Sequence, residues 1–177
     1  LRVGLIGIVT HWVKLWEKPE NLTHFALTDP VEAVRPLAEK LRSQVDVLIG
    51  VYHGGLEKDL HTGALLSETD ENEGCRLCEQ FPFDVLLTGH QHIALANETY
   101  AGTHVVQTPC NAAAYVKVEM DEQGRFYSQL MTPPDRAELT PEQEKLWQDT
   151  NLWLDRPIGH LSRAIWPEDK LTMALHS

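Results

Sequence analysis

The sequence predicts an α/β fold built on a mixed sheet. Apolar strand-like runs alternate with segments of helical periodicity through residue 92, which is the order expected of parallel strands joined by helices. Later segments alternate polar and apolar residues on both sides of a tight turn, as antiparallel strands do. The chain has 177 residues, 42% of them hydrophobic, so it can bury the core of an ordinary domain.

The first part of the chain contains three apolar runs that predict buried strands, and they lie at 2–9, 45–52 and 84–88. Asp29-Pro30 has the form of an N-cap followed by a first helical residue, so a helix is expected from there to about Leu41. Pro36 lies inside that helix and is expected to kink or shorten it. A long polar loop from His53 to Asp70 and a short helix over 71–80 complete this half.

The second part predicts strands over 104–107 and 114–120, and a hairpin turn at 121–124 followed by a return strand to Met131. Thr132-Pro133-Pro134-Asp135 marks a boundary. Thr140 and Gln143 then have the spacing of a capping box around Pro141, which predicts a helix that runs to Leu154.

Composition excludes several functions. The net charge of −11 argues against a surface that binds a nucleic-acid polymer, and no run reaches the roughly 18 apolar residues of a membrane span. Three cysteines do not make a disulfide framework. Cys75 and Cys78 form a C-x-x-C that could belong to a zinc knuckle or a redox pair, but the surrounding helical pattern favours structural packing.

Histidines follow two of the buried strands in glycine-rich loops. Gly89-His90-Gln91-His92 comes directly after Val85-Leu86-Leu87, and His53 ends the preceding strand ahead of Gly54-Gly55. Glycine permits the sharp turn that lets neighbouring imidazoles diverge toward metal ions. The two elements together predict a metal site formed by His53, His90 and His92.

These stretches, with Val3-Gly4-Leu5-Ile6-Gly7 and the closing hairpin, resemble the calcineurin-like metallophosphoesterases. The branch most similar is the bacterial 5'-nucleotidase and 2',3'-cyclic-nucleotide phosphodiesterase group. The resemblance implies a four-layer α/β sandwich with mixed sheets, two divalent ions (zinc, manganese or similar) and a nucleotide or other phosphate ester as substrate. It assigns His53 and His90 to one ion and His92 to the other, and it suggests a periplasmic or cell-surface location.

The resemblance also implies a domain organisation. Residues 1–132 correspond to the C-terminal part of the catalytic domain, 133–157 to a linker helix, and 158–177 to the start of a truncated substrate-binding domain. The family's Asp-x-His, bridging aspartate and Asn-His pair do not occur at the matching place, so the N-terminal half of the sandwich is expected to be missing. The catalytic histidine is then expected upstream of Leu1. We expect the 177-residue chain by itself to be weakly active or inactive.

Two alternatives remain open: a non-catalytic structural or interaction domain that retains the fold, and a mononuclear metal-binding protein. Asp59-Leu60-His61 looks like the absent Asp-x-His, but its polar surroundings predict a solvated loop. Asp84 begins the strand that His90 follows, roughly 20 Å away at about 3.3 Å per residue, so it is not expected to be a ligand. The remaining histidines are expected to be surface or hydrogen-bonded rings; they are His11, His24, His104, His160 and His176. No substrate-binding residue is predicted.

Overall fold

The computed structural model describes residues 1–134 and 138–160. The chain divides into two compact units, Leu1–Pro133 and Pro134–Ser177. The predicted α/β class with a mixed sheet is confirmed in the first unit. The strand-like segment expected over 158–177 lies outside the described residues from residue 161 onward. The assignment of the units to parts of a catalytic domain and its neighbour stays a prediction.

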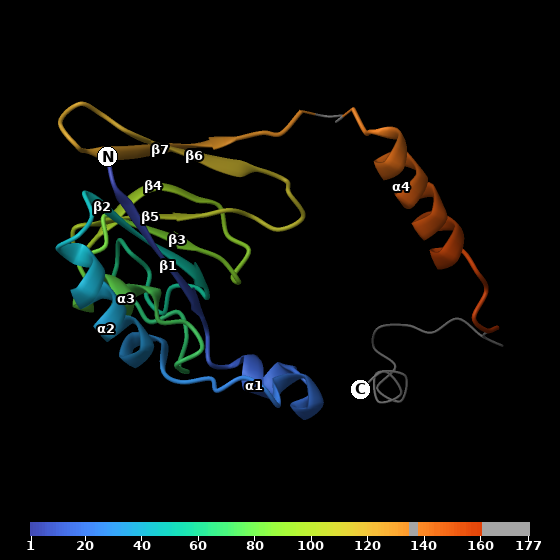
Figure 1. The fold of residues 1–177 in the computed structure, drawn as a ribbon, viewed down its shortest axis with the longest axis horizontal. Coiled ribbons are helices and arrows are strands. Elements are labelled where there is room, and N and C mark those ends of the chain that lie inside the picture. Colours follow the sequence, from blue (N-terminus) through green and yellow to red (C-terminus); the bar gives the residue numbers. More distant parts are fainter. Residues whose placement is uncertain (135–137, 161–177) are drawn as a thin grey trace. The chain divides into compact units, whose positions relative to one another are not determined.

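The main sheet has five strands in the order β1-β2-β3-β5-β4 (Figure 1). Four of them are parallel neighbours: β1 (Val3–Val9), β2 (Val47–His53), β3 (Val85–Thr88) and β5 (Thr103–Gln107). Val9 lies opposite His53, and Thr88 lies opposite Gln107. The carboxyl ends of all four strands therefore meet at one edge of the sheet. The four strands predicted at these places are confirmed, with small shifts at their ends. The expectation that the first of them is buried is wrong, because β1 lies at an edge of the sheet and one of its faces, which includes Leu5, is exposed.

The fifth strand, β4 (Leu95–Tyr100), was not predicted from the sequence. It pairs antiparallel with β5, and its register shifts between Leu95 and Glu98, where Asn97 has a φ of 61°. This irregularity interrupts the polar–apolar alternation that marks a strand. Pairing with the fully buried β5 determines its conformation.

Helix α2 (Pro30–Arg42) begins as predicted, because the Asp29 carboxylate accepts hydrogen bonds from the backbone N–H groups of Val31 (2.8 Å) and Glu32 (3.1 Å). The expectation that Pro36 would shorten the helix is wrong. Pro36 lies on the exposed side, where water can satisfy the carbonyl that its missing N–H leaves free. A short helix α1 (Val13–Trp16) and a 3₁₀ turn η1 (Pro19–Leu22) precede α2 and carried no clear sequence signal.

Helix α3 (Gly74–Gln80) begins later than the predicted residue 71. The Gly74 N–H donates to the Gly55 carbonyl at 2.9 Å, and the next two N–H groups, those of Cys75 and Arg76, donate to the Glu57 carboxylate at 2.9 and 2.7 Å. Cys75 and Cys78 are both buried on this helix, as the packing interpretation predicts. Burial raises the pKa of each thiol to about 12, so both are protonated at neutral pH.

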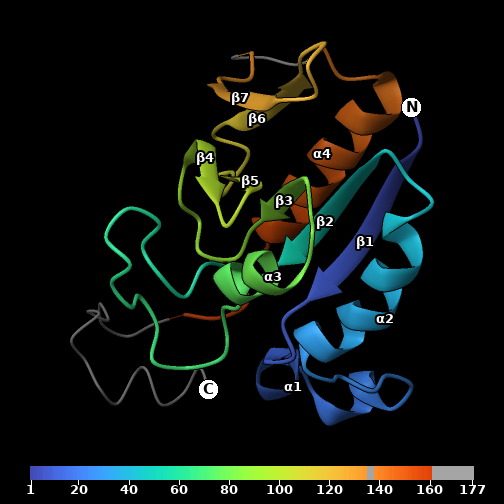
Figure 2. The same ribbon diagram turned by 90° about the vertical axis from the view of Figure 1, so that its left-hand side faces the viewer.

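The first unit has three layers (Figure 1 and Figure 2). Helices α2 and α3 cover one face of the sheet, and the predicted hairpin of β6 (Tyr115–Met120) and β7 (Phe126–Met131) covers part of the other. A hollow of about 350 Å³ lies between the hairpin and the apolar sheet face. The four-layer sandwich requires a further layer, which residues 1–134 do not supply, so it stays an expectation from the resemblance.

The second unit contains helix α4 (Pro141–Leu154). Its predicted capping box is confirmed: the Gln143 N–H donates to Thr140 Oγ1 (3.3 Å), and the Thr140 N–H donates to Gln143 Oε1 (2.9 Å). Among residues 1–134 and 138–160, no helix has the length and apolar character needed to cross a membrane.

Candidate functional site

The site lies at the carboxyl edge of the parallel strands, where β2 and β3 are neighbours. His53 is the last residue of β2, and His90 follows β3 after Gly89. Their ring centroids are 5.5 Å apart in an edge-to-face arrangement. A Cβ placed on Gly89 would lie 3.9 Å from His53 Nδ1, so the His53 ring lies over this glycine. The structure therefore brings two of the three predicted ligands together.

The histidine loop has an unusual backbone. His90 and His92 have φ angles of 70° and 57°, in the left-handed region that non-glycine residues seldom adopt. Such conformations persist only where surrounding contacts hold them, and they are concentrated at functional sites. Two left-handed residues on either side of Gln91 turn the chain sharply at the strand end.

Gln91 supplies the contacts that hold this loop. Its Oε1 accepts from the Leu56 N–H at 2.8 Å, and its Nε2 donates to the Leu56 carbonyl at 2.9 Å. The Gly89 N–H donates to the Gly54 carbonyl at 3.0 Å. A Cβ on Gly55 would approach the Gln91 side chain to 2.2 Å, so a larger residue there would displace Gln91 from this position. The loops after β2 and β3 are thus bound to each other.

Two neighbours of His90 were missed by the sequence analysis. Glu71 Oε1 lies 2.7 Å from His90 Nε2, and the indole ring of Trp16 stacks on the imidazole with a centroid distance of 5.0 Å and an interplanar angle of 19°. Glu71 belongs to the long connection after β2 and Trp16 to the short helix α1. No local sequence pattern marks either residue, because both reach His90 only through the tertiary fold.

His11, after β1, lies at the same edge and is buried. Its Nε2 is 3.3 Å from Asp70 Oδ2, and its Nδ1 is 3.7 Å from Glu73 Oε2. His11 Nδ1 and Glu73 Oε2 are buried without a hydrogen-bond partner among the described residues. Burial raises the pKa of Glu73, which opposes ionisation of this carboxylate. The ring interacts with these carboxylates rather than with His53 or His90 in the contacts that the structure records.

Two further histidines lie away from this edge. His104 is buried on β5 with Nε2 2.8 Å from Ser128 Oγ, and burial lowers its pKa, which confirms a hydrogen-bonded core ring. The side chain of His61 is 71% exposed. Asp59 accepts hydrogen bonds from the N–H groups of His61 (3.1 Å) and Thr62 (2.7 Å), so the Asp-Leu-His sequence forms the predicted solvated loop.

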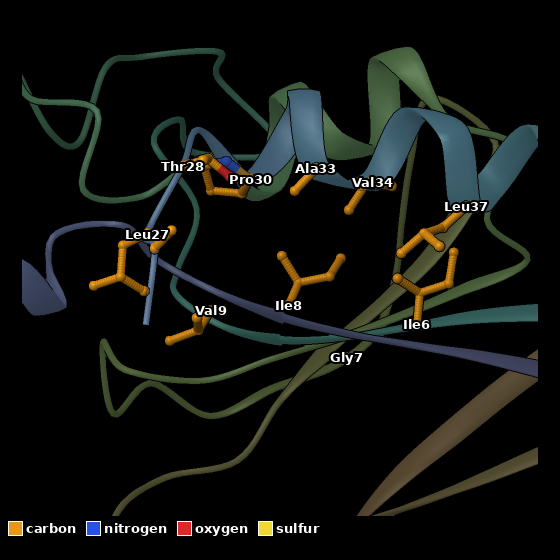
Figure 3. Close-up of a pocket in the computed structure, with 11 residues that line it drawn as sticks. Ile6, Gly7, Ile8, Val9, Leu27, Thr28, Pro30, Ala33, Val34 and Leu37 are labelled. Carbon is orange, nitrogen blue, oxygen red and sulfur yellow. The ribbon is translucent and has the colours of Figure 1, made fainter. Parts of the chain in front are cut away.

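Asp84 is engaged in structural contacts at the start of β3. It accepts from Arg42 Nη1 and from the Leu48 N–H, each at 2.7 Å. A second hollow of about 170 Å³ lies between β1 and α2, and Figure 3 shows its apolar lining. None of the side chains that line it is titratable, so it offers no group for metal binding or acid–base chemistry.

The donor set at the histidine edge fits part of a metal site. Neutral imidazoles are good ligands for zinc and similar ions, but such an ion takes about four ligands. His92 is exposed. Across residues 1–134 and 138–160, no three His, Cys, Asp or Glu side chains are arranged to hold an ion. The ligand roles of His53, His90 and His92 therefore stay predictions.

The predicted resemblance to bacterial nucleotide phosphoesterases and 5'-nucleotidases is confirmed by two comparisons. The chain is 26% identical, over 107 residues, to the trifunctional nucleotide phosphoesterase protein YfkN of Bacillus subtilis (strain 168). It also matches a solved structure from Staphylococcus aureus, described as a candidate 5'-nucleotidase in complex with α-ketoglutarate, with a TM-score of 0.77 and 27% identity. No protein-family model matches.

Coverage limits what these relatives imply. The match to the B. subtilis protein includes 58% of this chain and 7% of the relative. The match to the S. aureus structure includes 97% of this chain and 35% of that chain. The chain thus spans about a third of the structural neighbour and a much smaller share of the curated relative.

Proposed function

We propose that this chain is part of a metal-dependent hydrolase of nucleotide phosphate esters, of the 5'-nucleotidase or 2',3'-cyclic-nucleotide phosphodiesterase kind. The observation that carries the proposal is the pair of imidazoles, His53 and His90, whose centroids are 5.5 Å apart at the ends of adjacent parallel strands. Ligand sites in open α/β sheets gather at this edge. The names of the two relatives support a nucleotide ester as the substrate class.

In this proposal His53 and His90 would hold one divalent ion and His92 a second. Two such ions supply positive charge for phosphate oxygens and lower the pKa of water. The chain's own contribution is to present neutral imidazoles from a rigid edge, since only the neutral ring can coordinate. The bonds between Gln91 and Leu56 fix the positions from which His90 and His92 project. By the resemblance, the carboxylate ligands and the catalytic histidine of such a site would be residues other than those described here.

The experiment is a comparison of metal content and hydrolysis. The 177-residue chain would be purified metal-free, loaded with manganese or zinc, and assayed with a chromogenic phosphate diester and with nucleoside monophosphates. We expect bound metal with weak or no turnover. His90→Ala and His92→Ala should each lose metal, whereas His61→Ala, the matched exposed histidine, should retain it. Loss in His61→Ala with retention in His90→Ala would refute the assignment of ligands.

There are two other candidates: a non-catalytic domain of the same fold, and a protein that holds a single ion. The lack of a three-ligand cluster among residues 1–134 and 138–160 favours the non-catalytic domain. Metal content separates the candidates. A chain that binds no manganese or zinc supports the non-catalytic domain, and one equivalent that depends on His53 and His90 but not on His92 supports the mononuclear protein.

A further inference from the structure

The connection between β2 and α3 ends in four consecutive polar residues, Asp70-Glu71-Asn72-Glu73, which we call the acidic connector. Each of them is hydrogen-bonded to a residue at the end of β1 or β2 or just after it. On the β1 side, Trp12 Nε1 donates to the Asp70 carboxylate (2.7 Å) and Thr10 Oγ1 donates to the Glu71 carbonyl (2.8 Å). On the β2 side, the Gly55 N–H donates to Asn72 Oδ1 (2.7 Å) and the Glu73 N–H donates to the Tyr52 hydroxyl (3.2 Å). Thr10 and Tyr52 are 0% and 2% exposed. The backbone of the connector is therefore held at two buried points.

From this fixed backbone the Glu71 side chain reaches the loop after β3. Its Oε1 lies 2.7 Å from His90 Nε2, which is a short hydrogen bond of the charge-assisted kind. A carboxylate in its ionised form can only accept a hydrogen bond, and with such a partner this contact requires the proton on Nε2. A neutral ring protonated at Nε2 has its lone pair on Nδ1. The bond therefore selects one tautomer of His90.

Trp16 restricts the same ring from its face. The stack, with centroids 5.0 Å apart and planes at 19°, opposes rotation of the imidazole, while Glu71 holds its edge. The backbone beside the ring is held as well, because the neighbouring side chain of Gln91 is bonded to Leu56. Edge, face and backbone thus fix the orientation of one ring.

We propose that Glu71 is a positioning residue: it holds His90 in the Nε2–H tautomer and so presents Nδ1 to a metal ion. The role toward the metal rests on the proposed function, whereas the hydrogen bond does not. A ligating histidine commonly donates its other ring N–H to a carboxylate, and removal of such a partner weakens metal binding by about 10–100-fold. Glu71 requires no contact with substrate or metal to act in this way.

The test measures the ring and the metal separately. Long-range ¹⁵N NMR on the 177-residue chain, at a pH about two units above the ordinary imidazole value, reports the tautomer and the exchange of the ring proton. Zn²⁺ titration by calorimetry reports affinity. The variants are Glu71→Ala, Glu71→Gln, which keeps an acceptor oxygen, and Glu68→Gln, an exposed carboxylate of the same connection.

In the wild type we expect one His90 tautomer with a slowly exchanging Nε2 proton. Glu71→Ala should lose the proton signal and bind Zn²⁺ about 10–100-fold more weakly, Glu71→Gln should restore the tautomer, and Glu68→Gln should behave as wild type. Equal Zn²⁺ affinity in all variants, with mixed tautomers in the wild type, overturns the role of Glu71 and leaves the proposed function standing. A fixed tautomer with no Zn²⁺ binding in any variant overturns the proposed function and the role toward the metal.

Discussion

Replacing Gln91 with leucine removes the two side-chain hydrogen bonds that join the loops after β2 and β3. Each such bond contributes about 1 kcal/mol to stability, and a buried N–H left without a partner costs about 1–3 kcal/mol. Leu56, which provides both backbone partners, is 2% exposed, so water cannot readily replace Gln91 there. We therefore expect Gln91→Leu to lower the free energy of unfolding by about 2–4 kcal/mol.

The assay is urea unfolding of the 177-residue chain followed by circular dichroism, with NMR contacts between the His53 and His90 rings as a local readout. Gln123→Leu is the matched control, because Gln123 lies exposed in the turn of the β6–β7 hairpin, and it should change stability by less than about 0.5 kcal/mol. If Gln91→Leu behaves like this control and the ring contacts persist, the side chain of Gln91 does not hold the two loops together.

Four further outcomes are expected. Burial raises the pKa of Glu73, so over a range of pH the native state keeps the proton that the unfolded state has lost. The stability that Glu73 contributes is therefore present in acid and falls as pH rises from about 4.3. Glu73→Gln should flatten this pH dependence in urea unfolding. Burial lowers the pKa of His104, so its contribution is present above about pH 6.5 and is lost as pH falls; a His104→Gln variant that keeps the wild-type slope below pH 6.5 would contradict this. Cys75→Ala should cost about 1 kcal/mol of stability with metal content unchanged, as measured by unfolding and elemental analysis. His61→Ala should change the free energy of unfolding by less than about 0.5 kcal/mol, and a larger loss would show contacts beyond the exposed loop.

Several elements follow from signals that lie within a few residues of one another. Asp29 caps α2, Thr140 and Gln143 close the box at α4, and Gly124, with a φ of 78°, makes the hairpin turn. These interactions are local, so they can be recognised before the fold is known. The apolar runs of β1, β2, β3 and β5 are equally clear, because strands of a parallel sheet form nearly continuous hydrophobic segments. Which of these strands has an exposed face, as β1 does, is decided by its place at the edge of the sheet.

The meeting of His53 and His90 follows from a rule that links sequence to topology. Both end apolar runs, and adjacent parallel strands place their carboxyl ends together, so their proximity could be predicted without coordinates. The same rule does not place the His92 ring, because His90 and His92 both have left-handed backbone conformations that change the direction of the chain after the strand. The direction of that ring is set by the loop and not by the strand.

Other features depend on contacts between residues far apart in the chain. β4 is a strand because β5 pairs with it, despite the irregular register at Leu95 and Glu98. Glu71 reaches His90 because buried partners on β1 and β2 hold its backbone. Strand-end histidines and capped helices can therefore be predicted from the sequence. The partners that orient those histidines are brought in by tertiary packing, because a hydrogen bond between residues nineteen positions apart produces no sequence pattern.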